Sequence, residues 1–160
     1  MVVTAVKPGT SFVLTQSNGK PHYELWAEHL GASNLQLEVW QLPSAATPQI
    51  LKPTRIAGLK GRNLALIEHR VLRRLAKASL DLGGLKPQKP KTFLIEEELA
   101  MMLGLIFRVL APMRSRENML ACMEGIEAMG REEAAYWLGM AMHRKNPRRV
   151  LAALRMLMKD

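Results

Sequence analysis

The first half of the chain alternates apolar and polar residues in a way that predicts β-strands. Every second residue is apolar between residues 22 and 28 and again between residues 35 and 41. Such a pattern turns one face of each strand toward a core and the other toward polar surroundings. Asn18-Gly19 predicts a tight hairpin turn between a strand at residues 12–16 and the strand that starts at residue 22. With one more edge strand near the N-terminus, we expect a small antiparallel sheet of three or four strands.

The same alternation places two tryptophans, Trp26 and Trp40, on the polar face of the expected sheet. One face cannot supply the core and also bury both indoles unless something covers the other face. Either the C-terminal helices fold over that face, or another protein binds to it. We favour the second alternative, because each helix needs its apolar stripe for its own bundle. Trp26 and Trp40 are therefore predicted to be exposed residues that bind a protein partner.

From residue 62 onward, apolar residues recur three and four positions apart, which predicts helices. A first helix over residues 62–80 has an apolar side and a basic side, and Gly83-Gly84 ends it. Two prolines in residues 85–91 predict an extended linker, after which Thr92 is expected to cap the next helix. Four helices are predicted from there onward, and their limits are set by Pro112, Ser115, Gly130 and Asn146-Pro147.

Together these elements predict an α+β fold: a small antiparallel sheet, a basic helix and a C-terminal bundle of four helices. The expected segments are a β-sheet region over residues 1–50, a basic connector and helix over 51–92, and the helical bundle over 93–160. The longest purely apolar run, residues 99–107, is far shorter than the roughly 20 residues that a membrane span needs. With Cys122 as the only cysteine, no disulfide framework is expected, and we predict a cytoplasmic protein that does not contact a membrane.

The positive charge of the chain is concentrated in one segment. The formal net charge is +9. Residues 51–92 hold eleven basic and two acidic side chains, whereas residues 1–50 sum to −1 and residues 93–160 to +1. A concentrated field of this kind attracts polyanions, and arginine binds phosphate oxygens through two donors at once. The predicted phosphate-binding residues are Lys60, Arg62, Arg70, Arg73, Arg74 and Lys77, with Arg148, Arg155 and Lys159 on the last helix.

No catalytic or metal-binding pattern stands out. The four histidines are scattered, no cysteine pair exists, and no metal or other cofactor is expected. Cys122 lies beside apolar residues on its helix, which indicates a buried structural thiol. Gly58-Leu59-Lys60-Gly61-Arg62 precedes a helix and could bind a phosphorylated ligand through backbone amides, although it lacks the spacing of a P-loop. We expect a protein that is not an enzyme.

Methionine is the other unusual feature, because every methionine except Met1 follows residue 100. Most of these side chains are expected to fill the core of the bundle. Met101 and Met140 lie off the predicted apolar stripes, so they are assigned to the surface that binds a protein partner. Trp137, by contrast, is predicted to point into the bundle.

Residues 132–143 (EEAAYWLGMAMH) and 146–151 (NPRRVL) resemble an uncharacterised family of small prokaryotic proteins found beside phage-defence genes. The resemblance covers about the last thirty residues. It implies a prokaryotic cytoplasm and an accessory role in a larger assembly, and it brings no active site with it.

The expected function is that of a non-catalytic accessory subunit that contacts nucleic-acid phosphates, with little sequence specificity, and docks on a larger protein partner. Two alternatives stay open. The basic residues could bind an acidic protein, which would make the chain a protein–protein adaptor. Less favoured is a small enzyme that acts on a phosphorylated ligand through the loop at residues 58–62.

Overall fold

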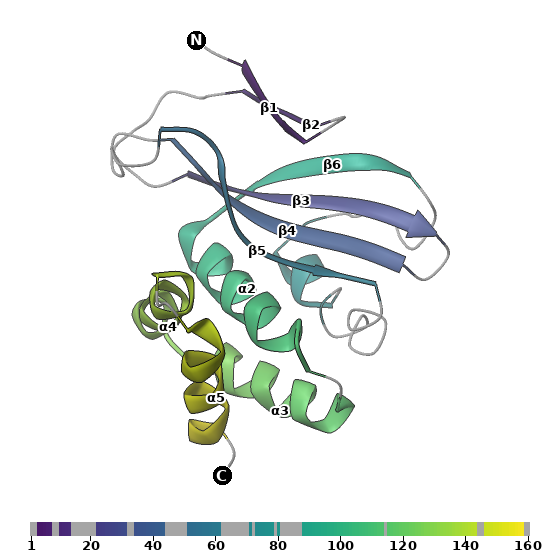
Figure 1. Ribbon diagram of the computed structural model, residues 1–160. Coiled ribbons are helices and arrows are strands. Elements are labelled where there is room, and N and C mark those ends of the chain that lie inside the picture. Colours follow the sequence, from purple (N-terminus) through teal and green to yellow (C-terminus); the bar gives the residue numbers. More distant parts are fainter. Residues whose placement is uncertain are drawn as a thin grey trace.

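The computed structural model describes residues 3–7, 10–13, 22–31, 34–43, 51–61, 71, 73–78, 80, 88–113, 115–143 and 146–158. A four-stranded antiparallel sheet in the order β5-β4-β3-β6 packs against helices, which confirms the α+β class (Figure 1). Its strands are β3 (His22–Gly31), β4 (Asn34–Leu42), β5 (Thr54–Lys60) and β6 (Gln88–Ile95). The helices are α2 (Glu97–Leu110), α3 (Arg116–Glu127), α4 (Arg131–His143) and α5 (Pro147–Leu157).

The predicted alternation in β3 and β4 is confirmed. Leu25 lies opposite Val39 on β4 and Phe93 on β6, and all three belong to one apolar cluster with the helices. We call this helix-covered side the inner face of the sheet and the opposite side the outer face. The outer face carries a separate buried cluster, formed by Trp26, Trp40 and Leu42.

A β-bulge shapes the edge strand β5. Val39 pairs with Ala57 and Trp40 with Arg55, so Ile56 is an extra residue between them. The bulge lets two consecutive side chains, Ile56 and Ala57, both join the inner cluster. The guanidinium Nε of Arg108 on α2 donates a 2.6 Å hydrogen bond to the carbonyl oxygen of Ile56. This bond ties the bulge to the helix layer.

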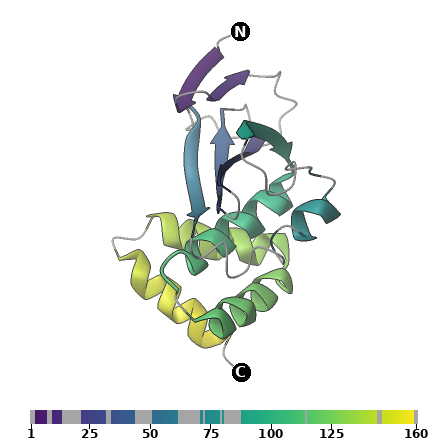
Figure 2. The ribbon, with the colours of Figure 1, turned by 90° about the vertical axis from the view of Figure 1, so that its right-hand side faces the viewer.

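The hairpin predicted from Asn18-Gly19 is wrong in its pairing. The segment at residues 10–13 forms β2 (Thr10–Val13), which pairs with β1 (Val3–Lys7), whereas β3 lies between β4 and β6. Asn18 and Gly19 themselves lie outside the described residues. The β1–β2 pair lies at the end of the molecule opposite α5, with β2 next to β6 (Figures 1 and 2).

The linker expected at residues 85–91 is extended from residue 88, but it belongs to the sheet. Residues 88–95 form β6. The larger segment expected to be a connector and helix, residues 51–92, therefore contributes to two strands, β5 and β6. β6 is an edge strand, where Pro90 is tolerated because one side of the strand needs no ladder partner. Thr92 is therefore wrong as a helix cap. It pairs with Trp26, and α2 starts only at Glu97.

The later helix limits agree more closely with the sequence. Ser115 is the N-cap of α3, and its hydroxyl oxygen accepts a 3.3 Å hydrogen bond from the backbone N–H of Asn118. Pro147 opens α5 as expected. Of the helix predicted over residues 62–80, residues 71 and 73–77 are helical, whereas Ala78 lies in a turn and Leu80 lies outside the helix. Residues 62–70 lie outside the described part.

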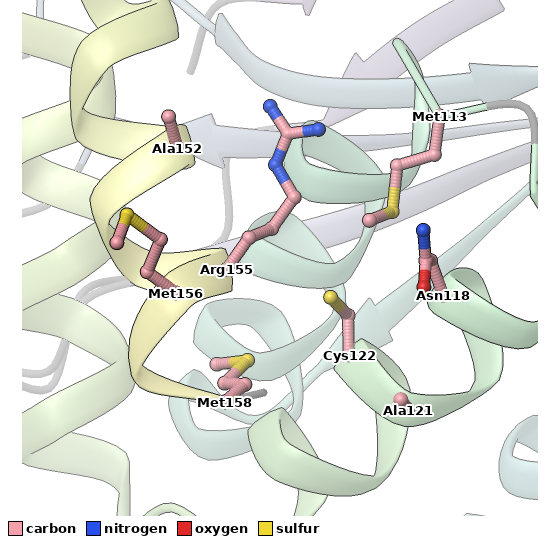
Figure 3. A pocket seen from close by; sticks show the side chains of 8 residues that line it. All are labelled: Met113, Asn118, Ala121, Cys122, Ala152, Arg155, Met156 and Met158. Atoms are coloured by element: carbon pink, nitrogen blue, oxygen red, sulfur yellow. The ribbon is translucent and has the colours of Figure 1, made fainter. Parts of the chain in front are cut away.

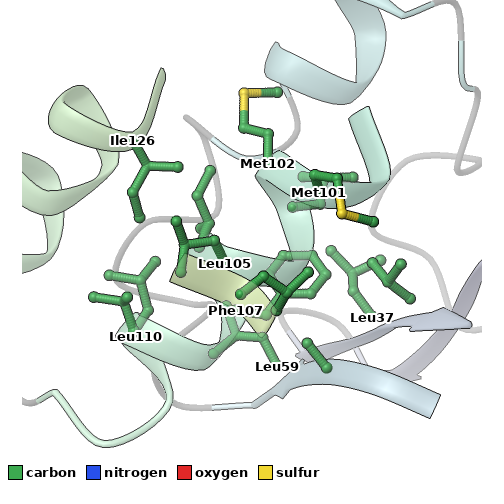
Figure 4. Packing of buried hydrophobic residues seen from close by; sticks show 14 of the residues in the cluster. Leu37, Leu59, Met101, Met102, Leu105, Phe107, Leu110 and Ile126 are labelled. Carbon is green, nitrogen blue, oxygen red and sulfur yellow. The ribbon is translucent and has the colours of Figure 1, made fainter. Parts of the chain in front are cut away.

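Helix α2 is the centre of the fold, because it lies between the sheet and the three C-terminal helices (Figures 1 and 2). Ten of its fourteen residues are buried, including every one from Ala100 to Phe107. Met101 is 8% exposed and packs in the core, so its predicted place on a partner surface is wrong (Figure 4). A helix that packs against neighbours on two sides buries most of its surface and not a single stripe. No helix in the described ranges combines the length and apolar character of a membrane span.

Candidate nucleic-acid interface

The predicted basic helix is only partly exposed in the positions that are described. Arg73 and Lys77 are exposed, whereas Arg74 is half-buried. Nη2 of Arg74 lies 3.1 Å from the sulfur of Met102 on α2. Arg62 and Arg70 lie outside the described residues. Among the described cations of this helix, Arg73 and Lys77 are the exposed ones.

The charge around these cations is mixed. Arg74 and Lys77 line a hollow of about 440 Å³ together with Glu96 and Glu98 from the start of α2. Two carboxylates beside two cations weaken the local positive field that a phosphate backbone would meet. Counting charges by segment could not reveal this mixture of charges, because the glutamates follow the basic residues by about twenty positions in the chain.

The expected phosphate-binding loop at residues 58–62 is not a loop over most of its length. Gly58 and Lys60 belong to β5, and Lys60 is exposed at its end. Gly61 has a φ of +68°, and its backbone N–H donates to the carbonyl oxygen of Leu35 at 3.2 Å. Since that amide is already bonded, it cannot cradle a phosphate. The loop prediction is wrong for residues 58–60, which lie in β5, whereas Gly61 lies in a turn.

The last helix carries the clearest basic surface. Arg148 and Arg149 are both exposed in the first turn of α5, and that turn contains no acidic residue. Arg155 lies two turns later and is half-buried, with Nε donating to the carbonyl oxygen of Leu151 at 3.3 Å. Lys159 lies outside the described residues. Arg148 keeps its predicted exposure, and Arg149 joins it as a cation that the prediction omitted.

Arg155 lines a cavity of about 290 Å³ between α3 and α5, with Met113, Cys122 and Met158 among its neighbours (Figure 3). Cys122 is 4% exposed, which confirms the predicted burial of the thiol. Burial raises the pKa of Cys122, and the positive charge of Arg155 only partly opposes that rise. A buried thiol with a raised pKa is a poor nucleophile.

The two tryptophans of the outer face are buried within this chain. Trp26 is 2% exposed and Trp40 is 7% exposed, so the prediction that both are exposed is wrong. The C-terminal helices do not cover them either, because these helices pack on the inner face. The assignment of Trp26 and Trp40 to a partner-binding surface depended on their exposure, so it is no longer supported. Only Met140, among the four predicted partner-binding residues, is partly exposed.

A buried carboxylate organises the outer face. Glu38 is 3% exposed, and both of its oxygens are in contact with neighbouring side chains. Trp40 Nε1 donates to Oε1 at 3.1 Å, and Gln36 Nε2 donates to Oε2 at 3.0 Å. Arg55 Nε lies 3.2 Å from Oε2. The charge of Glu38 is therefore neutralised and its oxygens are bonded, as burial of a carboxylate requires.

Glu24 lies on the same face of the neighbouring strand, opposite Trp40, but its surroundings differ. Within the part of the chain that the structure describes, Oε2 of Glu24 is buried without a hydrogen-bond partner. Burial raises the pKa of Glu24 to about 7. The two glutamates thus have opposite environments, one stabilised as an anion and the other favoured in its neutral form.

Most of the chain matches a known sequence family. The match covers residues 23–160 and is to a domain of unknown function, DUF7680. The chain belongs to that family. No curated protein and no solved structure was found to match it. The DUF7680 match starts within β3, so β1 and β2 lie outside it, whereas the four-stranded sheet from Tyr23 on and helices α2 to α5 lie inside.

Sequence analysis missed one surface of the DUF7680 domain, a groove between α4 and α5. Trp137, Met140 and His143 of α4 and Arg149 of α5 line this groove, whose volume is about 670 Å³. Trp137 was predicted to point into the bundle, and it is partly exposed in this groove. The signal that could have found the groove is the short separation in sequence between the end of α4 at His143 and the start of α5 at Pro147.

The described residues contain no cluster of three or more His, Cys, Asp or Glu side chains that could hold a metal ion.

Proposed function

We propose that this DUF7680 domain is a non-catalytic accessory subunit that contacts nucleic-acid phosphates and docks on a protein partner. The observation that carries the proposal is the first turn of α5, where Arg148 and Arg149 are exposed and no acidic residue is present. The amino end of a helix is its positive end, so cations there lower helix stability. A bound phosphate would remove that cost and would find two guanidinium groups in place.

The cations at Lys60, Arg73 and Lys77 extend this proposed surface to a second region. All three are exposed. Their contribution should be smaller than that of α5, because Glu96 and Glu98 share the hollow with Lys77. We therefore propose Arg148 and Arg149 as the main phosphate contacts and the basic helix as a secondary one.

The proposed setting is a prokaryotic, cytoplasmic assembly in phage defence. The likeness of residues 132–143 to small proteins found beside phage-defence genes supports it. The docking role is supported by two exposed apolar side chains at the end of α5, Met156 at 75% and Leu157 at 67%. Apolar side chains exposed side by side are a feature of protein interfaces.

Fluorescence anisotropy with labelled duplex DNA, over a series of salt concentrations, tests the phosphate contacts. On duplex DNA each phosphate contact contributes about −0.9 to the slope of log affinity against log salt. The double variant Arg148→Gln/Arg149→Gln should therefore flatten the slope by about 2. Arg73→Gln/Lys77→Gln should flatten it by less.

Arg116 provides a matched control, because it is also an exposed arginine in the first turn of a helix but has Glu117 beside it. Arg116→Gln should leave the slope unchanged. Absence of binding at low salt, or an equal effect of Arg116→Gln, would refute the proposal.

A protein–protein adaptor is the second candidate, and the mixed hollow lined by Arg74, Lys77, Glu96 and Glu98 favours it. Alternating charges suit a protein surface better than a phosphate backbone. Affinity purification from a native host, with and without nuclease, separates the two candidates. A partner that stays bound after nuclease treatment, and is lost in Lys77→Glu but not in Arg148→Gln/Arg149→Gln, would identify the adaptor.

A further inference from the structure

The groove between α4 and α5 combines an aromatic wall with a cationic rim. The indole of Trp137 lines it and meets the ring of Tyr136 edge-on, with centroids 5.7 Å apart and an interplanar angle of 81°. Met140 and Val150 add apolar surface. Arg149 of α5 lines the groove and is exposed, and His143, the last residue of α4, lines it as well. None of the described residues that line the groove carries a carboxylate.

We propose that this groove binds an unpaired base of single-stranded nucleic acid, stacked on Trp137, while Arg149 binds the adjoining phosphate. The inference rests on the proposed function and deepens it, from phosphate contact to a preference for single strands. A flat aromatic side chain beside an arginine is the combination by which proteins hold single strands without reading their sequence. At about 670 Å³ the groove lies within the usual range of ligand sites.

Charge favours a nucleotide over an apolar peptide as the occupant. Arg149 lines the groove, and Arg148 is exposed next to it in the same turn. A purely apolar side chain would leave these guanidinium groups without an anionic partner, whereas a nucleotide brings a phosphate together with its flat base. The bases of a duplex are stacked inside the helix and cannot enter the groove, so stacking on Trp137 is open to single strands alone.

The test uses the full chain with two labelled probes, a short oligo-dT and a short oligo-U, and with a duplex DNA for comparison. Trp137→Leu should weaken binding of the single strands about tenfold or more. Duplex binding should stay unchanged. Trp137→Phe should restore most of the affinity, because phenylalanine also stacks on a base. Leu94→Ala removes an exposed apolar side chain on β6, outside the groove lining, and should have little effect.

A second readout is independent of affinity. Stacking of a base should quench the emission of Trp137 when either oligonucleotide is added, and Trp137→Phe should abolish that quenching. Arg149→Gln should reduce the salt slope for single strands by about 0.7, the contribution of one phosphate. Thermal unfolding of each variant shows whether it is folded, which matters because Trp137 also packs against the core.

The outcomes separate this inference from the proposed function. If no nucleic acid binds, both fail. If single strands and duplex bind equally, with a salt slope that depends on Arg148 and Arg149 but not on Trp137, the proposed function stands and the groove proposal is overturned. A tenfold loss in Trp137→Leu for single strands alone, with quenching by oligo-dT or oligo-U, supports the groove as a base-binding site.

Discussion

Trp40 donates a 3.1 Å hydrogen bond from its indole Nε1 to Oε1 of Glu38, two residues earlier on the same face of β4. Both side chains are buried, at 7% and 3% exposure. The indole gains an acceptor and the carboxylate gains a donor, so each removes a cost of burying the other. The outer face of the sheet thus combines buried apolar side chains with a buried, hydrogen-bonded carboxylate.

Loss of the Glu38 carboxylate should therefore destabilise the fold. Glu38→Ala leaves the buried indole N–H of Trp40 without its acceptor and removes the partner of Arg55. We expect the free energy of unfolding to fall by about 2–4 kcal/mol. Arg55→Ala should cost less, because the Arg55 side chain is half exposed. Urea denaturation measures both changes, and an equal loss in the two variants would contradict this account.

Gly58 is the residue that allows Arg55 to reach Glu38. A Cβ built at Gly58 would collide with the guanidinium of Arg55, which lies over the glycine next to the carboxylate. Gly58→Ala should thus displace Arg55 and break its contact with Glu38. In an Arg55→Ala background the same change should stabilise the fold by about 0.4–1 kcal/mol, because alanine lowers the entropy of the unfolded chain. A double-mutant cycle tests this, and simple additivity of the two changes would contradict it.

The tryptophans should differ in their access to solvent. The chain has three, of which Trp26 and Trp40 are buried and Trp137 is partly exposed. In the purified protein without any partner, we expect blue-shifted emission from the two buried indoles and quenching by acrylamide of the third alone. Trp137→Phe should remove the quenchable fraction. Strong quenching that persists in this variant would mean that the outer face is open.

Strand alternation predicted the inner face of the sheet correctly but not the state of the outer face. An alternation with a period of two residues shows which side chains share a face of the sheet, as it did for Leu25 and Leu37. It does not state whether that face is covered. The contact from Arg55 to Glu38 depends on a bulge in β5, which places Arg55 opposite Trp40, and no local pattern marks that bulge. The burial of both tryptophans therefore could not be read from the sequence.

Helical spacing failed at Met101 for a different reason. A single apolar stripe assumes that a helix has one buried side, but α2 is covered by the sheet and by other helices. The unbroken apolar run over residues 99–107 was the available signal for burial all round.

At Arg155 the helical spacing implied that this side chain shares one exposed basic face with Arg148. The neighbouring helix α3 reduces the exposure of Arg155, because Arg155 lines the cavity beside Cys122 and is half-buried there.

Glu24 should make the stability of the protein depend on pH. Burial raises its pKa from 4.5 to about 7. Between these values the folded protein holds a proton that the unfolded chain has released, so raising the pH favours unfolding. The stability that the proton provides is complete below about pH 4.5 and is lost by about pH 7. The shift corresponds to at most about 3 kcal/mol.

Glu24→Gln isolates this contribution, because glutamine is similar in size and stays neutral. The difference in free energy of unfolding between Glu24→Gln and the wild type should grow in favour of the variant from pH 4.5 to 7. It should then stay constant up to pH 9. Urea denaturation at four pH values measures it. Parallel pH profiles for the two proteins would show that Glu24 is ionised in the folded state.

Cys122 should react with thiol reagents only when the fold opens. The thiol is buried between α3 and α5, and burial raises its pKa despite the nearby charge of Arg155. At pH 8 we expect labelling at least about 100-fold slower than for a free thiol, because only open molecules expose a thiolate. The rate should rise with urea in proportion to the open population. Apart from any effect on stability, it should not depend on the charge of Arg155, since the unfolded chain no longer holds the two side chains together. Arg155→Gln is the informative variant. If labelling occurs in the folded state through the cavity, removing the cation raises the pKa of Cys122 further and slows the reaction without a change in urea dependence. A rate limited by opening predicts instead that any effect of Arg155→Gln follows its effect on stability alone.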